Sequence, residues 1–163
     1  MLVGNLLGSS QGTVTKTGGT LATGTNADAS DPDLEIGVFG TGVITQTAGT
    51  INAGDDLVLG HEAGSNGTCN VEGGSVNVDN GVFVGVRGSG TLSVSGGGQL
   101  DVAGHLFVGD DLNSNGSVNV NRASASVDIT DSLVGGGRDI SQSGQGSLTI
   151  SDGAVNVGSS LKI

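Results

Sequence analysis

Short runs in which apolar and polar residues alternate recur along the whole chain, separated by glycine-rich segments. The stretch from Gly90 to Gly109 shows the unit. Its three runs, Leu92–Val94, Leu100–Val102 and Leu106–Val108, each place one residue between two apolar ones. Alternation with a period of two is the pattern of a β-strand with one buried face. The unit therefore predicts three short strands joined by tight turns.

The same unit can be aligned six times along the sequence. The leading apolar residue of the first strand forms the column Val14, Ile44, Cys69, Leu92, Val118 and Leu148. Two positions earlier stands a column of glycines, Gly12, Gly42, Gly67, Gly90, Gly116 and Gly146. Successive units are 30, 25, 23, 26 and 30 residues long. A repeat of this length, varying mainly at one corner, indicates a solenoid.

We therefore predict an all-β protein, with residues 1–163 forming a single parallel β-solenoid of about six coils. The coils exceed the roughly 18 residues of a left-handed hexapeptide helix, which favours a right-handed, three-sided β-helix with three parallel sheets. Glycines at the corners are expected to turn the backbone through positive φ. In the first coil the corner between the second and third strands is seven residues longer than in the other coils, and this insertion lies within positions 24–33.

No polar cap is evident at either end of the array, although terminal coils expose strand edges and core. The sequence predicts either an uncapped part of a longer array or a filament subunit. The candidate axial contacts are Met1, Val3, Leu161 and Ile163.

The outward position of the third strand differs from the other two outer faces, which are polar. It carries apolar residues in most coils, and we take as a candidate assembly face Leu2, Val58, Phe83, Phe107 and Val134. Strands that are apolar on both faces are usually covered on both. Two explanations stand: corner loops fold over this stripe, or it makes a lateral contact with another protomer.

Composition narrows the partners. The chain has 33 glycines, three phenylalanines, no Trp or Tyr and a formal charge of −11. Five Lys+Arg residues cannot neutralise a phosphate backbone, so nucleic acid is not expected as a partner. No apolar run approaches the roughly 18 residues of a membrane helix, so membrane insertion is not expected either. The expected partners are further copies of the chain and a candidate glycan.

Oxygen-rich side chains gather in the inserted loop of the first coil. Asp28, Asp31 and Asp33 form a candidate calcium site, because carboxylates are the ligands that Ca²⁺ prefers. The alternative is a solvated acidic loop, since neither an EF-hand nor a calcium β-roll motif is present. Apart from calcium, no cofactor is expected.

Several single residues stand out within the columns. Cys69 occupies an apolar column and is expected to be a buried small hydrophobe. Asp101 and Asp128 should stack in adjacent coils, where each carboxylate disfavours ionisation of the other. Lys16 and Gln46 interrupt a column of Val and Ile, which predicts an end of the array with either a polar plug or a splayed strand.

The sequence favours a protein without catalytic activity. Paired carboxylates such as Asp101 with Asp128 are the groups that glycosidases use, so a polysaccharide-active enzyme is a third alternative. Aromatic sugar platforms are missing, and neither His61 nor His105 has a Ser or Cys partner placed to be activated. We therefore predict no catalytic residue.

Some repeated phrases resemble a known group of proteins. Gly-Thr-Leu-Ser-Val-Ser-Gly-Gly (90–97), Gly-Ser-Leu-Thr-Ile-Ser-Asp-Gly (146–153) and Leu-Phe-Val-Gly (106–109) are similar to repeats of bacterial autotransporter-type passenger regions and PEP-CTERM-type exported surface proteins. The resemblance covers essentially the whole chain, and it implies an extracellular or cell-surface location but no active-site residues. The expected function is a structural subunit of a filament, matrix or stalk, with an adhesin that binds carbohydrate or another surface ligand as the alternative.

Overall fold

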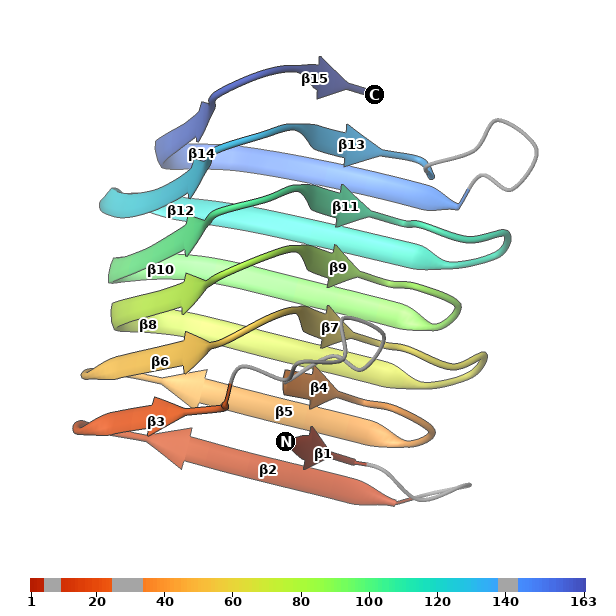
Figure 1. Cartoon of the computed structure of the whole chain (residues 1–163), viewed down its shortest axis with the longest axis horizontal. Helices are drawn as coiled ribbons and strands as arrows, with labels where there is room; N and C mark the ends of the chain where they lie inside the picture. The colour runs from red at the N-terminus through yellow and green to blue at the C-terminus, as the bar shows by residue number, and fades with distance from the viewer. Residues whose placement is uncertain (5–9, 25–33, 138–143) are drawn as a thin grey trace.

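The computed structural model describes residues 1–4, 10–24, 34–137 and 144–163, and all regular secondary structure in these ranges is β-strand. The strands pair in parallel and stack coil upon coil, so the predicted β-solenoid is confirmed (Figure 1). The chain passes once through each layer of the stack, from the N-terminal coil at one end to the C-terminal coil at the other (Figure 1).

One sheet is built from the third strand of every coil and is called the third-strand sheet below. Its order along the stack is β1 (Leu2–Val3), β4 (Leu34–Ile36), β7 (Leu57–Leu59), β9 (Val82–Val84), β11 (Leu106–Val108), β13 (Leu133–Gly135) and β15 (Leu161–Lys162). The register pairs Leu106 with Val82 on one side and with Leu133 on the other. Equivalent residues of successive coils therefore stack directly, as the sequence columns predicted.

The first and second strands of each coil form the other sheet, the long-strand sheet. In the first two coils they are separate strands, β2 (Gln11–Lys16), β3 (Thr20–Ala22), β5 (Thr41–Gln46) and β6 (Thr50–Ala53). In the later coils they run into single long strands, β8 (Asn66–Val78), β10 (Ser89–Val102), β12 (Asn115–Ile129) and β14 (Gln145–Val157).

The three predicted strand columns thus make two hydrogen-bonded sheets rather than three. The ladder between β8 and β10 continues past the glycine corner, with a register shift between Val94 and Gly97. Such a bulge bends a strand without ending its pairing. The chain consequently reverses direction at the left-hand edge of Figure 1 while the sheet stays continuous.

The apolar columns of all three strands meet in one core between the sheets. In the central coil Leu92, Leu100 and Leu106 are fully buried, and Cys69 lies in the same core. Burial of a side chain of this size stabilises the fold by roughly 1.5–3 kcal/mol. The predicted burial of Cys69 is confirmed, and burial raises the pKa of its thiol to about 12, so it remains protonated at neutral pH.

The glycine columns have two separate physical causes. Gly67 belongs to the invariant first column, and a Cβ there would overlap the carbonyl oxygen of Ile36 in the preceding coil. Its backbone does not have positive φ, so the predicted cause is wrong for this column. Positive φ occurs at the corner before the second strand, as at Gly49 with φ 82°, and directly after the third strand, as at Gly60 with φ 70°. Close approach of stacked coils therefore explains the first column, whereas at Gly49 and Gly60 positive φ and close approach act together.

Two polar side chains enter the core at the glycine corner of the first two coils. Lys16 Nζ donates to the carbonyl oxygens of Gly18, Gly19 and Ala48, at 3.2, 2.7 and 3.1 Å. Gln46 Nε2 donates to those of Gly49, Gly73 and Ser75, at 3.1, 3.2 and 3.0 Å. The amide oxygen of Gln46 is buried and has no hydrogen-bond partner among the described residues. The predicted polar plug is therefore present, and it bonds corner carbonyl groups.

Candidate functional surfaces

The outer column of the third-strand sheet is covered at one part and open at another. Val58 is only 5% exposed, whereas Leu2 is 53% exposed. Phe83 and Phe107 are half-buried and stack on each other in adjacent coils, with ring centroids 5.1 Å apart and planes at 20°. Val134 continues the column and is also half-buried. The candidate assembly face is thus reduced to its C-terminal half plus Leu2, because Val58 lies under neighbouring atoms.

The exposed side of this aromatic pair is bordered by polar groups. The ring of His105 lies against Phe107 with centroids 5.6 Å apart, and His105 Nε2 is 3.7 Å from a carboxylate oxygen of Asp131. Both side chains are about half exposed. The stripe is therefore narrow, apolar at its centre and charged at its rim, which is the anatomy of a small protein contact.

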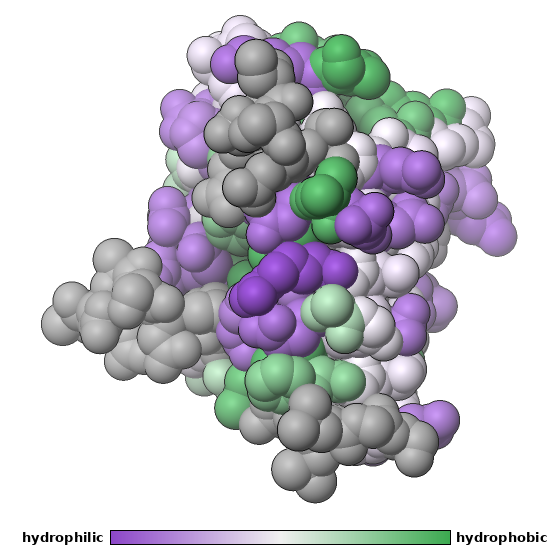
Figure 2. Space-filling model, turned by 90° about the vertical axis from the view of Figure 1, so that its right-hand side faces the viewer, coloured by the Kyte–Doolittle hydropathy of each residue, from purple (hydrophilic) through white to green (hydrophobic). Residues whose placement is uncertain are grey.

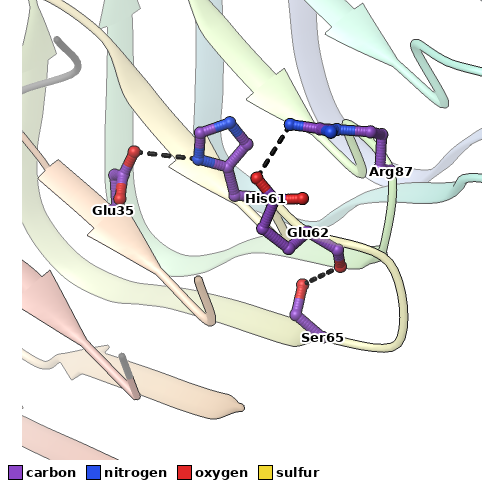
Figure 3. A network of polar contacts seen from close by, with 5 residues as sticks. All are labelled: Glu35, His61, Glu62, Ser65 and Arg87. Atoms are coloured by element: carbon purple, nitrogen blue, oxygen red, sulfur yellow. Dashed lines mark hydrogen bonds and ion pairs between the residues drawn. The ribbon is translucent and has the colours of Figure 1, made fainter. Parts of the chain in front are cut away.

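A polar network covers the N-terminal part of the same column, where Glu35 is 5% exposed. Figure 3 shows the side chains of Glu35 and His61 pointing toward one another, with Nδ1 of His61 2.9 Å from Oε1 of Glu35. The hydrogen bond to Glu35 raises the pKa of His61, against the opposing effect of burial. A charged imidazole beside a buried carboxylate is a stabilising pair.

The network continues into the loops that join third strands to the next first strands. Arg87 donates to Glu62 across coils at 2.8 Å, and Ser65 Oγ donates to the carbonyl oxygen of Glu62 at 2.6 Å (Figure 3). Figure 2 faces the edge formed by these loops and shows hydrophilic residues gathered near its mid-height. The groups are structural: they tie loops of neighbouring coils together.

One loop design occurs twice, and the column analysis did not detect it. Ser65 and Ser114 each donate from Oγ to the carbonyl oxygen three residues earlier, at 2.6 Å in both loops. The residue before each serine, Gly64 or Asn113, has positive φ. The signal is present in the sequence as Gly-x₄-Ser-Asn-Gly, at 60–67 and again at 109–116.

A shallow groove of about 340 Å³ lies on the outer face of the second-strand segments. Its lining includes Asn77, Asp79, Asp101, Asp128 and Thr130. Asp101 pairs in register with Asp128, as predicted. Partial burial, and then the nearby Asp128 carboxylate, raise the pKa of Asp101. Asn156 donates to Asp128 at 2.6 Å and Asn77 donates to Asn52 at 2.8 Å, so the groove presents both amides and carboxylates.

The C-terminal coil exposes much of its core. Ile150 is 49% exposed, Leu161 55% and Ile163 92%, and Leu148, Val155 and Val157 are only partly buried. At the other end Met1 is exposed, whereas Val3 is buried. Of the four candidate axial residues, Met1, Leu161 and Ile163 are therefore accessible and Val3 is not.

The candidate calcium ligands Asp28, Asp31 and Asp33 lie outside the described residues. Within the described ranges no group of three or more His, Cys, Asp or Glu side chains could hold a metal ion. The same ranges contain no helix long and apolar enough to cross a membrane.

Comparison with known proteins gives no relative for this chain. No protein-family model, no curated protein and no solved structure matches it. The fold class, an all-β parallel solenoid, is therefore defined by the chain's own columns and their stacking.

Proposed function

We propose that the chain is a non-catalytic structural module of a bacterial cell surface or extracellular matrix, which assembles by stacking coils end to end. The observation that carries this proposal is the repeat itself, in which equivalent residues of successive coils pair in register through the whole stack. A coil buries its apolar face only against neighbouring coils. The resemblance to exported repeat proteins supports the extracellular location.

The first coil of a second copy matches the C-terminal coil in most columns, and the exception is Lys16, which would lie over Ile150. Placed on β14, strand β2 brings Val14 over Leu148 and a glycine over a glycine, because both coils follow the same repeat. Placed on β15, strand β4 brings Leu34 over Leu161 and Glu35 beside Lys162. Opposite charges side by side in adjacent strands add a favourable pair.

The two sheets are out of step, which limits how copies can join. Among the described strands the third-strand sheet has seven members, whereas the long-strand sheet has six layers. If β2 of one copy pairs with β14 of another, β1 occupies the place where β4 must meet β15. Strand β1 is only Leu2–Val3, and it must leave if β4 of one copy is to pair with β15 of another.

Mass in solution and electron microscopy test this stacking. Deleting residues 1–4 is expected to shift the protein toward long, uniform fibres at concentrations where the intact chain stays small. Lys162→Glu in the deletion background is expected to shorten the fibres, because it places a second carboxylate beside Glu35 of the next copy. A deletion variant that folds and yet stays monomeric at high concentration contradicts the proposal.

A lateral contact through the Phe83–Phe107 pair is a separate route to association. Replacing both rings by Ser removes the apolar centre of the stripe, and the expected result is loss of side-by-side bundling with fibre length unchanged. Identical bundles in the double variant and the parent protein contradict a lateral role for this face.

The second candidate function is an adhesin, and the groove between Asn77 and Asp128 favours it. Paired carboxylates and amides can accept and donate hydrogen bonds to sugar hydroxyl groups. Glycan-array binding that disappears in Asn77→Ala and Asp101→Ala supports this function, whereas binding unchanged in both variants contradicts a role for the groove.

A further inference from the structure

One outer face of the solenoid carries no charge at any position. The first strand of each coil points three residues outward, and six coils give eighteen positions, called the neutral face below. They are Gln11, Thr13, Thr15, Thr41, Val43, Thr45, Asn66, Thr68, Asn70, Ser89, Thr91, Ser93, Asn115, Ser117, Asn119, Gln145, Ser147 and Thr149. Seventeen are hydroxyl or amide side chains and one is Val43. All of them are exposed or half-buried.

This face has no charged residue although the protein is strongly acidic, with 16 Asp+Glu residues. Charged residues lie at both rims of the face. Glu62 and Arg87 are in the loops at one rim, and Glu72 and Arg122 are at the glycine corner on the other. The second-strand segment carries Asp101 and Asp128 in adjacent layers, so stacking by itself does not exclude charge from an outer column.

The polar groups of the neutral face are not consumed by bonds between its own coils. In the described residues, Asn70 donates to Thr45 at 3.3 Å and Ser147 donates to the carbonyl oxygen of Gly116 at 3.4 Å. Both bonds are long, and a ladder that existed only for stability would be expected to be shorter and more regular. Within one coil Asn119 also donates to Ser117, at 3.3 Å.

The geometry of the face is flat and periodic. Its strands stack as straight ribbons (Figure 1), with coils about 4.8 Å apart and outward residues about 6.7 Å apart along a strand. Six layers and three columns therefore cover about 24 by 13 Å. A flat surface of that size can contact an extended ligand at many points.

We propose that the neutral face binds the surface of a neutral polysaccharide. Hydroxyl and amide groups both donate and accept, so they match sugar hydroxyl groups without a charge to desolvate. A cationic polymer would favour the acidic rims and an anionic one would be repelled by the net charge. Each contact is weak in water, and many contacts on one rigid face supply the affinity. This binding does not depend on axial stacking and uses a different face from the Asn77–Asp128 groove.

Depletion from suspensions of microcrystalline cellulose and of chitin tests the proposal, with soluble polygalacturonate as the anionic comparison. The triple variant Thr45→Val, Thr68→Val and Thr91→Val keeps the β-branched shape and strand preference but removes three hydroxyl groups from the centre of the face. We expect the parent protein to bind at least one neutral polymer and the triple variant to bind it about tenfold more weakly.

Thr20→Val with Thr50→Val, in the second-strand segment, is the matched control and is expected to bind as the parent does. Circular dichroism and the Tm check that every variant folds. The proposal is overturned if the parent binds neither neutral polymer, if it prefers polygalacturonate, or if the control loses as much binding as the triple variant. Inhibition of ice recrystallisation without polymer binding also overturns it, since the face would then order water instead.

Discussion

The middle coils and the C-terminal coil have the same sequence columns but very different burial. Leu92 and Val94 in the fourth coil are fully buried, whereas their counterparts Leu148 and Ile150 are half-buried and 49% exposed. The difference comes from the number of neighbours, because a middle coil is covered on both sides and the last coil on one. In a solenoid, a residue's contribution to stability is therefore set by its layer as much as by its type.

The N-terminal end differs from the C-terminal end in its chemistry. The last inward position of the first strand is Lys16 and Gln46 in the two N-terminal coils, and both side chains donate hydrogen bonds to backbone carbonyl groups. In the C-terminal coil the same position is Ile150. A polar plug has little to gain from a further apolar layer, whereas an exposed Ile does. We therefore expect the C-terminal coil to gain more from contact with a further coil than the N-terminal coil does.

The largest expected effect comes from replacing the same core leucine by alanine in a middle coil and in the C-terminal coil. Leu92→Ala is expected to lower the free energy of unfolding by about 3 kcal/mol, because it leaves a cavity in a fully packed core. Leu148→Ala, in the same column, is expected to cost about 1 kcal/mol. Urea unfolding of both variants measures this, and equal losses would contradict the layer argument.

Glycine substitutions at one corner give the next largest effect. Gly49 and Gly19 both have positive φ, but a Cβ on Gly49 would overlap the carbonyl oxygen of Gly19, whereas one on Gly19 meets no atom among the described residues. Gly49→Ala is expected to cost about 2.5 kcal/mol and Gly19→Ala about 1 kcal/mol. Thermal unfolding of the two variants compares them directly, and a larger loss at Gly19 would be inconsistent with this explanation.

Lys16 of the polar plug is expected to contribute less to the free energy of unfolding than the glycine at position 49. Lys16→Met keeps the apolar stem but removes the ammonium donor from three carbonyl groups. Hydrogen bonds to charged donors are worth more than neutral ones, and we expect a loss of about 1.5 kcal/mol in urea unfolding. The control Lys162→Met is exposed at the other end and is expected to be neutral. A more stable Lys16→Met protein would show that burying the charge outweighs its hydrogen bonds.

The smallest expected effect is the pH dependence of the stability that His61 contributes through its pairing with Glu35. The pKa of His61 is raised above 6.5 in the folded chain by Glu35, so its contribution is complete below that value and is lost as the pH rises through the raised pKa. The Tm difference between the parent and His61→Gln should therefore be larger at about pH 5.5 than at about pH 9. A difference independent of pH would mean that His61 contributes by packing alone.

The repeat columns predicted correctly those features that depend only on the spacing of residues along the chain. Alternation placed Leu92, Leu100 and Leu106 in the core, and the stacking of Asp101 on Asp128 followed from the repeat spacing. They were less informative where the cause lay in another coil. For Val58 the spacing left two alternatives open, a covered stripe or a lateral contact, and the structure shows the side chain buried. The positive-φ explanation for Gly67 was wrong, because the backbone of Ile36 is what excludes a Cβ.

The sequence by itself determined the repeat, the strand periodicity and the inward columns, because each follows from spacing within one chain segment. The three-dimensional structure was needed to show that the first and second strands share a sheet and that Glu35 meets His61. These features depend on how far each coil turns before the next is laid on it. The physical reason is that close contacts between layers, at Gly67 and at the Gln46 corner, select a single path for the chain.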